Sequence, residues 1–476
     1  MLVTLIGRLV QFALMFASVK IMTHLLTPEE MGKVALITTT TSLFALFLVN
    51  PVGMFINRRM HAWIAAHRFR RYFGLYVLYL FAVATIAAAS LLIGDQLGLD
   101  LGGASVPWVL ALVCGSLVFN TISTTLMLAL NMVERVLAFT LLTLGTLMAS
   151  LSMSIWLNHT GAPSAERWLA GTLLGQTLFG AIAYVVLFRG DTSQCCEPLR
   201  VSRNQWAAMA SFCWPIGLAV LMQWLHMQGY RFLLAERFGL AQLGMYAAGY
   251  GVAASLMSAF ETLLTTWYQP IFYRMANSTD PAQSDQAWSV YASVMVPASL
   301  LGMTALVAAS PNLPKVLLGS AFHDAGLYVL LGALAEWARM MVGLFGLNAH
   351  RHMSTRRLIV PNLLGTITTY LVLLAVISPL GLLAAPVGVF AGSFAVICCL
   401  WLHTYRDDPH VKLAWRPIMG WGGIAALVAA NAVLIQSRFA ASASPATALA
   451  ICLSVGLVWA GLTGLAVHQG LLKRRT

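Results

Sequence analysis

Charged residues are scarce in this sequence. Only 9% of its 476 residues are Asp, Glu, Lys or Arg, whereas 59% are hydrophobic and the mean hydropathy is +0.79. Soluble domains carry about 25% charged residues. The scarcity of charge therefore excludes a soluble globule. Apolar runs of roughly 20 residues recur along the chain, and such runs are typical of helices that cross a membrane.

Short strands of alternating polarity, which a membrane β-barrel would need, are also missing. Helices satisfy their own backbone hydrogen bonds in lipid. We therefore predict an all-α polytopic membrane protein with about 14 transmembrane helices. The expected spans lie near residues 3–25, 34–56, 73–94, 105–130, 136–157, 168–188, 208–233, 241–266, 287–309, 326–347, 358–377, 380–403, 417–435 and 446–468.

Motifs for disulfide bonding, metal binding and nucleotide hydrolysis are absent as well. Five of the seven cysteines lie in apolar runs, and Cys195 and Cys196 lie in a loop predicted to be cytoplasmic. Reduced thiols are the simplest interpretation. No Walker motif and no CxxC or His-rich metal spacing occurs. We therefore expect no catalytic residues, no cofactor, no metal and no enzymatic activity.

Acidic residues are outnumbered by basic ones, and the net charge is +12. Nucleic-acid binding would need basic residues interleaved with exposed aromatics, and no such patch is present, so no nucleic-acid partner is expected. With the N-terminus inside, nineteen of the 28 Lys and Arg residues fall in inner loops or the tail, five outside and four within spans. Cytoplasmic loops of membrane proteins are rich in Lys and Arg. This bias predicts cytoplasmic N- and C-termini and an even number of spans.

The opening of the chain and its seventh span share a pattern. A shift of 212 residues aligns Gln11 with Gln223 and Gly32 with Gly244, and it places Arg231 beside Lys20. Such a repeat predicts two parallel six-helix lobes with a site between them. We expect lobes at residues 1–190 and 208–405, joined by a cytoplasmic loop at 191–207. Residues 406–476 would add two helices and a basic tail.

Two stretches resemble a known family. HLLTPEEMGKVAL, from His24 to Leu36, is similar to the loop after the first span of polysaccharide repeat-unit exporters in the multidrug/oligosaccharidyl-lipid/polysaccharide export superfamily. LAQLGMYAAGYGVAASLMSAFETLL, from Leu240 to Leu264, resembles their eighth span. The resemblance covers the first twelve spans. It implies a V-shaped packing of the two lobes, and the flipping of undecaprenyl-pyrophosphate-linked oligosaccharides across the bacterial inner membrane for surface polysaccharide synthesis.

The cations within the spans are candidates for binding the pyrophosphate. Arg8 lies near the inner end of its span, and Lys20 and Arg231 lie near outer ends. An Arg or Lys in a cavity would lower the barrier to moving a charged head group through hydrocarbon. Snorkelling of a long basic side chain to the membrane surface is the alternative for each of them. The nearly equivalent repeat positions of Lys20 and Arg231 favour binding for that pair.

Polar residues deeper in the spans are candidates for binding sugar. Gln11, Gln223 and His226 lie well inside their helices. In a regular helix Gln223, His226 and Tyr230 would share one face, which would meet water or sugar hydroxyls. Interhelical hydrogen bonding is an equal alternative.

Three further residues are candidates for ion coupling. Glu261 is the best lone carboxylate within a span, although it lies within two turns of the predicted inner surface. Glu336 and Arg339 are three residues apart, so they can pair on one helix face. For Glu336 and Arg339 we favour this simple ion pair over a role in ion coupling.

The leading hypothesis is thus a lipid-linked oligosaccharide flippase whose partners are its substrate and membrane lipids, together with a polysaccharide polymerase and chain-length proteins. A cation-coupled drug antiporter of the same superfamily would favour an acidic cavity, whereas the first span here is cationic. A polymerase or ligase would favour a large external loop with catalytic residues, and the predicted external loops are short. A non-catalytic subunit of a secretion complex remains a further alternative.

Overall fold

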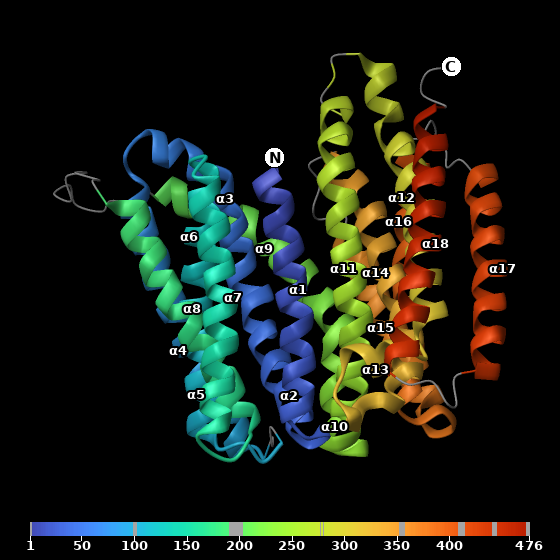
Figure 1. The fold of residues 1–476 in the computed structure, drawn as a ribbon. Helices are drawn as coiled ribbons and strands as arrows, with labels where there is room; N and C mark the ends of the chain where they lie inside the picture. The colour runs from blue at the N-terminus through green and yellow to red at the C-terminus, as the bar shows by residue number, and fades with distance from the viewer. Residues whose placement is uncertain are drawn as a thin grey trace. The chain divides into compact units, whose positions relative to one another are not determined.

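The computed structural model describes residues 2–98, 102–189, 203–276, 278, 280–351, 358–407, 415–439 and 445–472. Within this part of the chain all regular structure is helical (Figure 1). The first group of elements comprises α1 (Leu2–Leu25), α2 (Pro28–Phe44), η1 (Ala45–Val49), α3 (Asn50–Ala65), α4 (Phe69–Gln96), α5 (Val106–Gly115), η2 (Ser116–Asn120), α6 (Thr121–Met132), α7 (Val136–His159), α8 (Ala165–Phe188), α9 (Arg203–Trp224), η3 (Leu225–Gly229) and α10 (Tyr230–Phe238). The remainder comprises α11 (Leu240–Ala276), α12 (Pro281–Ala309), α13 (Leu313–Leu317), η4 (Ser320–Ala325), α14 (Gly326–Arg351), α15 (Ile359–Leu380), η6 (Gly381–Leu383), α16 (Ala384–Asp407), α17 (Trp415–Phe439) and α18 (Pro445–Leu472).

The predicted all-α membrane fold is confirmed. Eleven helical segments of the described chain are long and apolar enough to cross a membrane, and one of these, Ile359–Leu402, contains both α15 and α16. Two shorter apolar helices, Val10–Leu25 and Ile418–Asn431, fall where the first and thirteenth spans are expected. Counted in this way, every one of the fourteen predicted spans has its helix.

The tight turn predicted between the eleventh and twelfth spans is present. Gly381 follows α15 with a φ of 57°, a left-handed conformation that suits glycine. The next two residues complete the short 3-10 turn η6, and α16 begins at Ala384. The helices α15 and α16 then pack against each other along their length. A single glycine therefore reverses the chain between two membrane helices.

The eighth span is longer than predicted. The sequence pattern indicated residues 241–266, but α11 runs for 37 residues from Leu240 to Ala276. At 1.5 Å per residue such a helix is about 55 Å long, well beyond the roughly 30 Å hydrocarbon core. The last turns of α11 therefore extend past the bilayer. The predicted span ended before Gln269, Pro270 and Arg274, whereas the helix continues through all three.

The described chain forms two packing units. One contains residues up to Trp224 together with Arg231–Gly244, and the other contains Leu225–Tyr230 together with the chain from Met245 onward. The seventh span thus contributes to both. The proposed lobes at 1–190 and 208–405 place that span wholly in the second lobe, whereas α9 packs on α3 and η1 of the first unit. The lobes as moving bodies remain a prediction. Most of the 191–207 loop and the end of the basic tail lie outside the described residues.

The loop motif that carries the family resemblance has a structural role. Thr27 caps α2 by accepting a hydrogen bond from the Glu30 backbone N–H at 3.3 Å, and Pro28 occupies the first turn. The Glu30 carboxylate accepts a 2.7 Å hydrogen bond from the Ala165 N–H, where α8 begins. Its other oxygen pairs with Lys33 at 2.7 Å. The motif therefore fixes the start of two helices at once.

Gly32 and Gly244, which the repeat aligns, lie at a close crossing of the first unit. A methyl group added to Gly32 would lie 2.8 Å from the carbonyl carbon of Leu240. A methyl group added to Gly244 would lie 2.8 Å from the carbonyl carbon of Pro28. The shift of 212 residues that aligns the glycines also aligns Pro28 with Leu240. The two contacts are therefore equivalent, as an internal two-fold repeat requires, and only glycine fits at either position.

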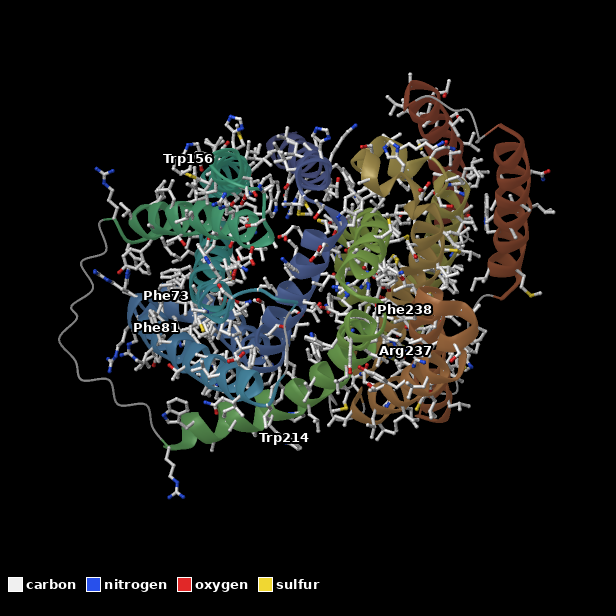
Figure 2. All side chains as sticks on the ribbon, turned by 90° about the horizontal axis from the view of Figure 1, so that it is seen from below. Phe73, Phe81, Trp156, Trp214, Arg237 and Phe238 are labelled. Carbon is white, nitrogen blue, oxygen red and sulfur yellow. The ribbon has the colours of Figure 1, made fainter. Side chains whose placement is uncertain are left out.

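Each unit buries its own apolar cluster. In the first, residues of α3, α4, α5 and α6 surround fully buried Met60 and Leu80. In the second, the Trp288 indole donates to the Leu344 carbonyl at 3.1 Å and contacts the rings of Phe345 and Trp401. Large side chains such as Trp156 and Trp214 remain about 60% exposed on the outside of the helices (Figure 2). Such surfaces suit contact with lipid rather than water.

Three short π-helical segments interrupt spans of the described chain. They are η1 in the second span, η2 in the fourth and η3 in the seventh. A π segment adds one residue to a turn and is frequent at functional sites. It also rotates the residues that follow it around the helix axis. Predictions of shared helix faces fail across such a segment.

Candidate functional site

The two candidates at the start of α1 contact each other. The Arg8 guanidinium donates a 3.0 Å hydrogen bond to the Gln11 side-chain oxygen. Both residues border a small cavity whose opposite wall is formed by Phe139 and Thr140 of α7. Arg8 is exposed and Gln11 is half-buried. The spacing of three residues along one helix brings this pair together, so a cation and an amide form one polar patch.

Lys20 and Arg231 belong to the same packing unit. Lys20 is exposed on α1, five residues before that helix ends at Leu25. Arg231, at the start of α10, donates a 3.2 Å hydrogen bond to the fully buried Thr39 hydroxyl of α2. Arg231 therefore lies along α2 inside the unit, whereas Lys20 is presented on its surface. The pyrophosphate-binding role of the two residues stays a prediction.

The hydroxyl side chains of α2 form hydrogen bonds within the first unit. Thr40 and Thr41 donate to backbone carbonyls one turn earlier. The Ser42 hydroxyl accepts a 2.9 Å hydrogen bond from the Trp224 indole of α9. These bonds satisfy the hydroxyls within the helix bundle.

The predicted common face of Gln223, His226 and Tyr230 is wrong. The π segment η3 begins two residues after Gln223 and ends just before Tyr230, so the spacing of a regular helix does not apply. His226 is only 3% exposed, and its Nε2 lies 2.9 Å from the Ser393 hydroxyl. Tyr230 is fully buried and bonds to the Tyr246 hydroxyl at 2.6 Å. Neither side chain faces water.

His226 is held tightly by two helices of the second unit. A methyl group added to Gly365 of α15 would lie 2.9 Å from its Nδ1, and one added to Gly392 of α16 would lie 3.0 Å from its Cε1. The imidazole therefore fills a notch between two glycines. This geometry favours interhelical hydrogen bonding over contact with sugar. Gln223 is half-buried at the end of α9 in the first unit.

The three candidates for ion coupling form a single cluster in the second unit. Arg339 of α14 donates to Glu336 at 2.6 Å, which is the pairing expected from their spacing. A second nitrogen of the Arg339 guanidinium, Nη2, donates to Glu261 of α11, also at 2.6 Å. The Tyr250 hydroxyl donates to the remaining oxygen of Glu336 at 2.7 Å. One guanidinium thus lies between two carboxylates.

The cluster carries a formal charge of −1 when both carboxylates are ionised. The Glu336 side chain is 6% exposed, whereas the side chains of Arg339 and Glu261 are 27% and 26% exposed. Glu261 is therefore the carboxylate with more access to the surroundings. Chemically, Arg339 ties α11 to α14 through its carboxylate partners on the two helices. No group of three potential metal ligands occurs among the described residues.

Sequence reasoning missed Tyr250 and the link between Glu261 and Arg339. The link joins residues 78 positions apart on two helices, and no local spacing reveals such a contact. Tyr250 lies eleven residues before Glu261 on α11, three turns of one helix. The position of a tyrosine on the same helix face as a candidate carboxylate was the available signal.

Comparison with solved structures defines the class of fold. A multidrug resistance MATE family transporter of the MOP superfamily, in an inward-facing conformation, superposes with a TM-score of 0.65 at 12% identity, covering 85% of this chain and 96% of its own. The lipid II flippase MurJ, in an inward closed conformation, has a TM-score of 0.63 at 11% identity and covers 97% of both chains. A mutant of a Vibrio cholerae MATE transporter has a TM-score of 0.58 at 16% identity, covering 85% of this chain and 95% of its own. This chain therefore shares the fold of these proteins.

The family follows from the sequence itself. The profile of the polysaccharide biosynthesis protein family matches residues 21–326. This chain therefore belongs to that family. No curated protein sequence matches it significantly. The expected resemblance to polysaccharide exporters is thus confirmed at the level of family and fold.

Proposed function

We propose that this protein flips polyprenyl-pyrophosphate-linked oligosaccharides from the cytoplasmic to the outer leaflet of a bacterial inner membrane by alternating access. Membership of the polysaccharide biosynthesis family over residues 21–326 carries the proposal. The fold shared with a lipid II flippase and with MATE transporters supports a transport role. The repeat units would serve surface polysaccharide synthesis, as O-antigen, capsule or exopolysaccharide.

The charges of the first unit favour an anionic substrate over a cationic drug. Its predicted spans contain Arg8, Lys20 and Arg231 and no acidic residue. A guanidinium matches phosphate oxygens through its planar fork. Arg8 with Gln11 would meet the head group near one end of α1, and Lys20 with Arg231 would meet it near the other. A cavity for organic cations would favour the opposite sign.

Coupling to an ion gradient is assigned to the cluster of Glu261, Glu336 and Arg339. Uptake of one cation at Glu261 would weaken its bond to Arg339 and loosen α11 from α14. The cluster would thereby change the packing of the second unit. The two predicted lobes, 1–190 and 208–405, would be the bodies that rock.

The proposed function also implies an orientation in the membrane and a set of partner proteins. The Lys and Arg bias supports cytoplasmic N- and C-termini. A polysaccharide polymerase and chain-length proteins would act on the product at the outer surface. The protein itself transports and performs no covalent chemistry.

Lipid analysis of a deletion strain tests the proposal. The polyprenyl-pyrophosphate pool is extracted and identified by mass spectrometry, and leaflet access is tested with an external sugar-binding probe. The expected result is a complete repeat unit that accumulates and is inaccessible from outside. Accumulation of an externally accessible unit would contradict flipping and favour a polymerase, ligase or accessory role. An unchanged pool would favour the drug antiporter.

A further inference from the structure

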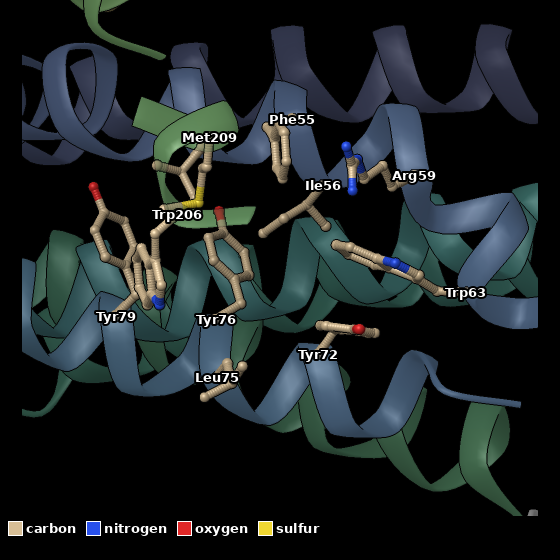
Figure 3. A pocket seen from close by; sticks show the side chains of 11 residues that line it. Phe55, Ile56, Arg59, Trp63, Tyr72, Leu75, Tyr76, Tyr79, Trp206 and Met209 are labelled. Carbon is tan, nitrogen blue, oxygen red and sulfur yellow. The ribbon is translucent and has the colours of Figure 1, made fainter. Parts of the chain in front are cut away.

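A cavity in the first unit lies apart from all the candidates above. It is lined by α3, α4 and the beginning of α9, has a volume of about 120 Å³ and is partly open to the surroundings. Ligand sites are mainly apolar, with a small number of polar groups that orient the ligand. Five of the lining residues on α3 and α4 are aromatic, and Trp206 of α9 closes one side (Figure 3). The lining, apolar with one charged group, is that of a binding site.

The rings are ordered against one another and against one cation. Trp63 at the end of α3 stacks on Tyr72 of α4, with 4.3 Å between ring centroids and an interplanar angle of 16°. The Arg59 guanidinium carbon lies 4.7 Å from the centroid of the Phe55 ring. Figure 3 shows Arg59 on α3 between Phe55 and Trp63 at the edge of the cavity. The cavity thus has flat apolar walls and a single positive group among its lining residues.

The elements around the cavity provide no acidic partner from their own sequence. From Met31 to Gly94 the chain contains no Asp or Glu, although Arg58, Arg59, Arg68, Arg70 and Arg71 all fall in this stretch. The α9 helix, Arg203–Trp224, also contains no acid. Arg59 is exposed. A cation in this setting attracts an anionic ligand.

The cavity lies toward one end of its helices. Trp63 is near the end of α3 at Ala65, Tyr72 is near the beginning of α4 at Phe69, and Trp206 is near the beginning of α9 at Arg203. The sequence predicts this end to face the cytoplasm because its loops are basic. A ligand there would have its anionic group at the level of the lipid head groups and its apolar part in the hydrocarbon layer.

We propose that this cavity binds a polyprenyl phosphate, with the phosphate on Arg59 and the first isoprene units between the aromatic walls. Isoprene units are flat around each double bond, so they lie face to face with rings such as Trp63, Tyr72 and Trp206. An unbranched acyl chain lacks these flat units. The choice of a polyprenyl lipid rests on the proposed function; the site itself rests on the cavity and its charge. The cavity would collect the lipid carrier on the side where sugars are attached.

Photo-crosslinking of the purified full-length protein tests this site. The protein is reconstituted in phosphatidylcholine nanodiscs with a polyprenyl phosphate whose terminal isoprene next to the phosphate carries a diazirine. Modified peptides are identified by mass spectrometry. The expected products are peptides of α3, α4 and α9 around the cavity. Undecaprenyl phosphate should compete strongly, whereas undecaprenol and phosphatidic acid should compete weakly. Equal competition by phosphatidic acid would overturn the isoprenoid assignment.

Arg59→Ala should weaken crosslinking about tenfold, because a charge-assisted hydrogen bond is lost. Arg59→Lys keeps the charge and should retain most of it. Arg58→Ala is the matched control: it removes the same charge from the adjacent position, which does not line the cavity. Equal losses for the two alanine variants would mean that only the general basic surface attracts the lipid.

A second pair of variants tests the cavity rather than its charge. Leu75 lines the cavity, and Leu75→Trp should fill it and reduce crosslinking at least as much as Arg59→Ala. Leu78 lies on the same helix, 67% exposed and outside the cavity, so Leu78→Trp should have no effect. Normal crosslinking in the Leu75 variant would overturn the site.

The two proposals can fail separately. An unchanged lipid pool in the deletion strain, together with Arg59-dependent crosslinking, would overturn the flippase and retain the lipid site. Accumulation of the repeat unit inside the cell, together with crosslinking that is indifferent to Arg59 and Leu75, would retain the flippase and overturn the site.

Discussion

The two packing units treat charge within the membrane in opposite ways. The predicted spans of the first contain Arg8, Lys20 and Arg231 and no acid, whereas those of the second contain two acids around one cation. In the first unit Arg8 donates to the amide of Gln11, and Arg231 donates to the hydroxyl of Thr39. In the second unit the charges neutralise most of one another. This difference in charge indicates that the two units have different roles.

A set of cations bonded to neutral groups keeps a positive field for a ligand, whereas a compact ion cluster holds helices together. Hydrogen bonding to an amide or hydroxyl leaves the full charge of an arginine in place. A guanidinium between two carboxylates instead fixes its own position and leaves only one net negative charge. We therefore propose that the first unit binds the substrate and that the packing of the second unit depends on an ion.

The largest effect is expected at the ion cluster. Arg339→Ala would leave Glu261 and Glu336 facing each other without their shared cation. Removal of one partner from a buried ion pair costs about 3–5 kcal/mol, and partial exposure reduces this to roughly 2–3 kcal/mol here. Thermal unfolding of the detergent-solubilised protein measures the loss. Adding Glu261→Gln to the variant should restore part of it, and an unchanged unfolding temperature of Arg339→Ala alone would contradict the cluster.

The second-largest loss of stability is expected at the close crossing of Gly32 and Gly244 in the first unit. Gly32→Ala or Gly244→Ala would push a methyl group into a backbone carbonyl, at a cost of about 1–3 kcal/mol each by overpacking. Gly74→Ala is the matched control, because nothing lies within 4 Å of the added methyl group on α4. That variant should gain up to about 1 kcal/mol from helix propensity. The unfolding midpoints of the three variants measure these changes in stability. Equal stability in all three variants would exclude the close crossing.

Loss of the embedded cations should reduce transport with little change in stability. Lys20→Ala combined with Arg231→Ala should lower export of the lipid-linked substrate about tenfold, which corresponds to about 1.4 kcal/mol of lost interaction. Surface polysaccharide per cell, normalised to the amount of protein, measures the effect. Lys315→Ala, on the short helix α13 of the second unit, serves as the control. Normal export by the double variant would contradict substrate binding and indicate that Lys20 and Arg231 only reach the membrane surface.

The smallest effect is expected at His226. Ser393→Ala removes its hydrogen-bond partner in the interior of the second unit and should cost about 1 kcal/mol of stability. Export per folded protein should stay normal, because this histidine packs between α15 and α16 and faces no water. A loss of export at unchanged stability would return His226 to the list of transport residues.

The positions of the helices could be predicted well from the sequence, because hydrocarbon imposes the length and polarity of every span. The short gap between the spans predicted at 358–377 and 380–403 required a tight turn, and Gly381 provides it. The length of α11 could not be predicted, since helix formation does not stop where hydropathy falls. The repeat of Gly32 and Gly244 was visible, but their reciprocal contacts with Leu240 and Pro28 emerge only from the packed chain.

The candidate site could be predicted only where its contacts are local. The pairing of Glu336 with Arg339, three residues apart on one helix, was predicted and is present. Arg8 and Gln11 have the same spacing and also pair, although that pair was not predicted. Glu261 joins Arg339 across 78 residues, beyond the reach of any spacing rule. The face predicted for Gln223, His226 and Tyr230 failed because η3 breaks the helix period, and no residue pattern marked that π segment.

Reconstituted transport tests the central claim most directly. The purified protein is inserted into liposomes that contain a fluorescent lipid-linked oligosaccharide in both leaflets, and an external glycosidase cleaves whatever sugar reaches the outer surface. If the protein is a flippase, sugar from the inner leaflet becomes accessible, and nearly all of the lipid is cleaved. Cleavage limited to the outer leaflet, as in protein-free liposomes, would contradict a flippase.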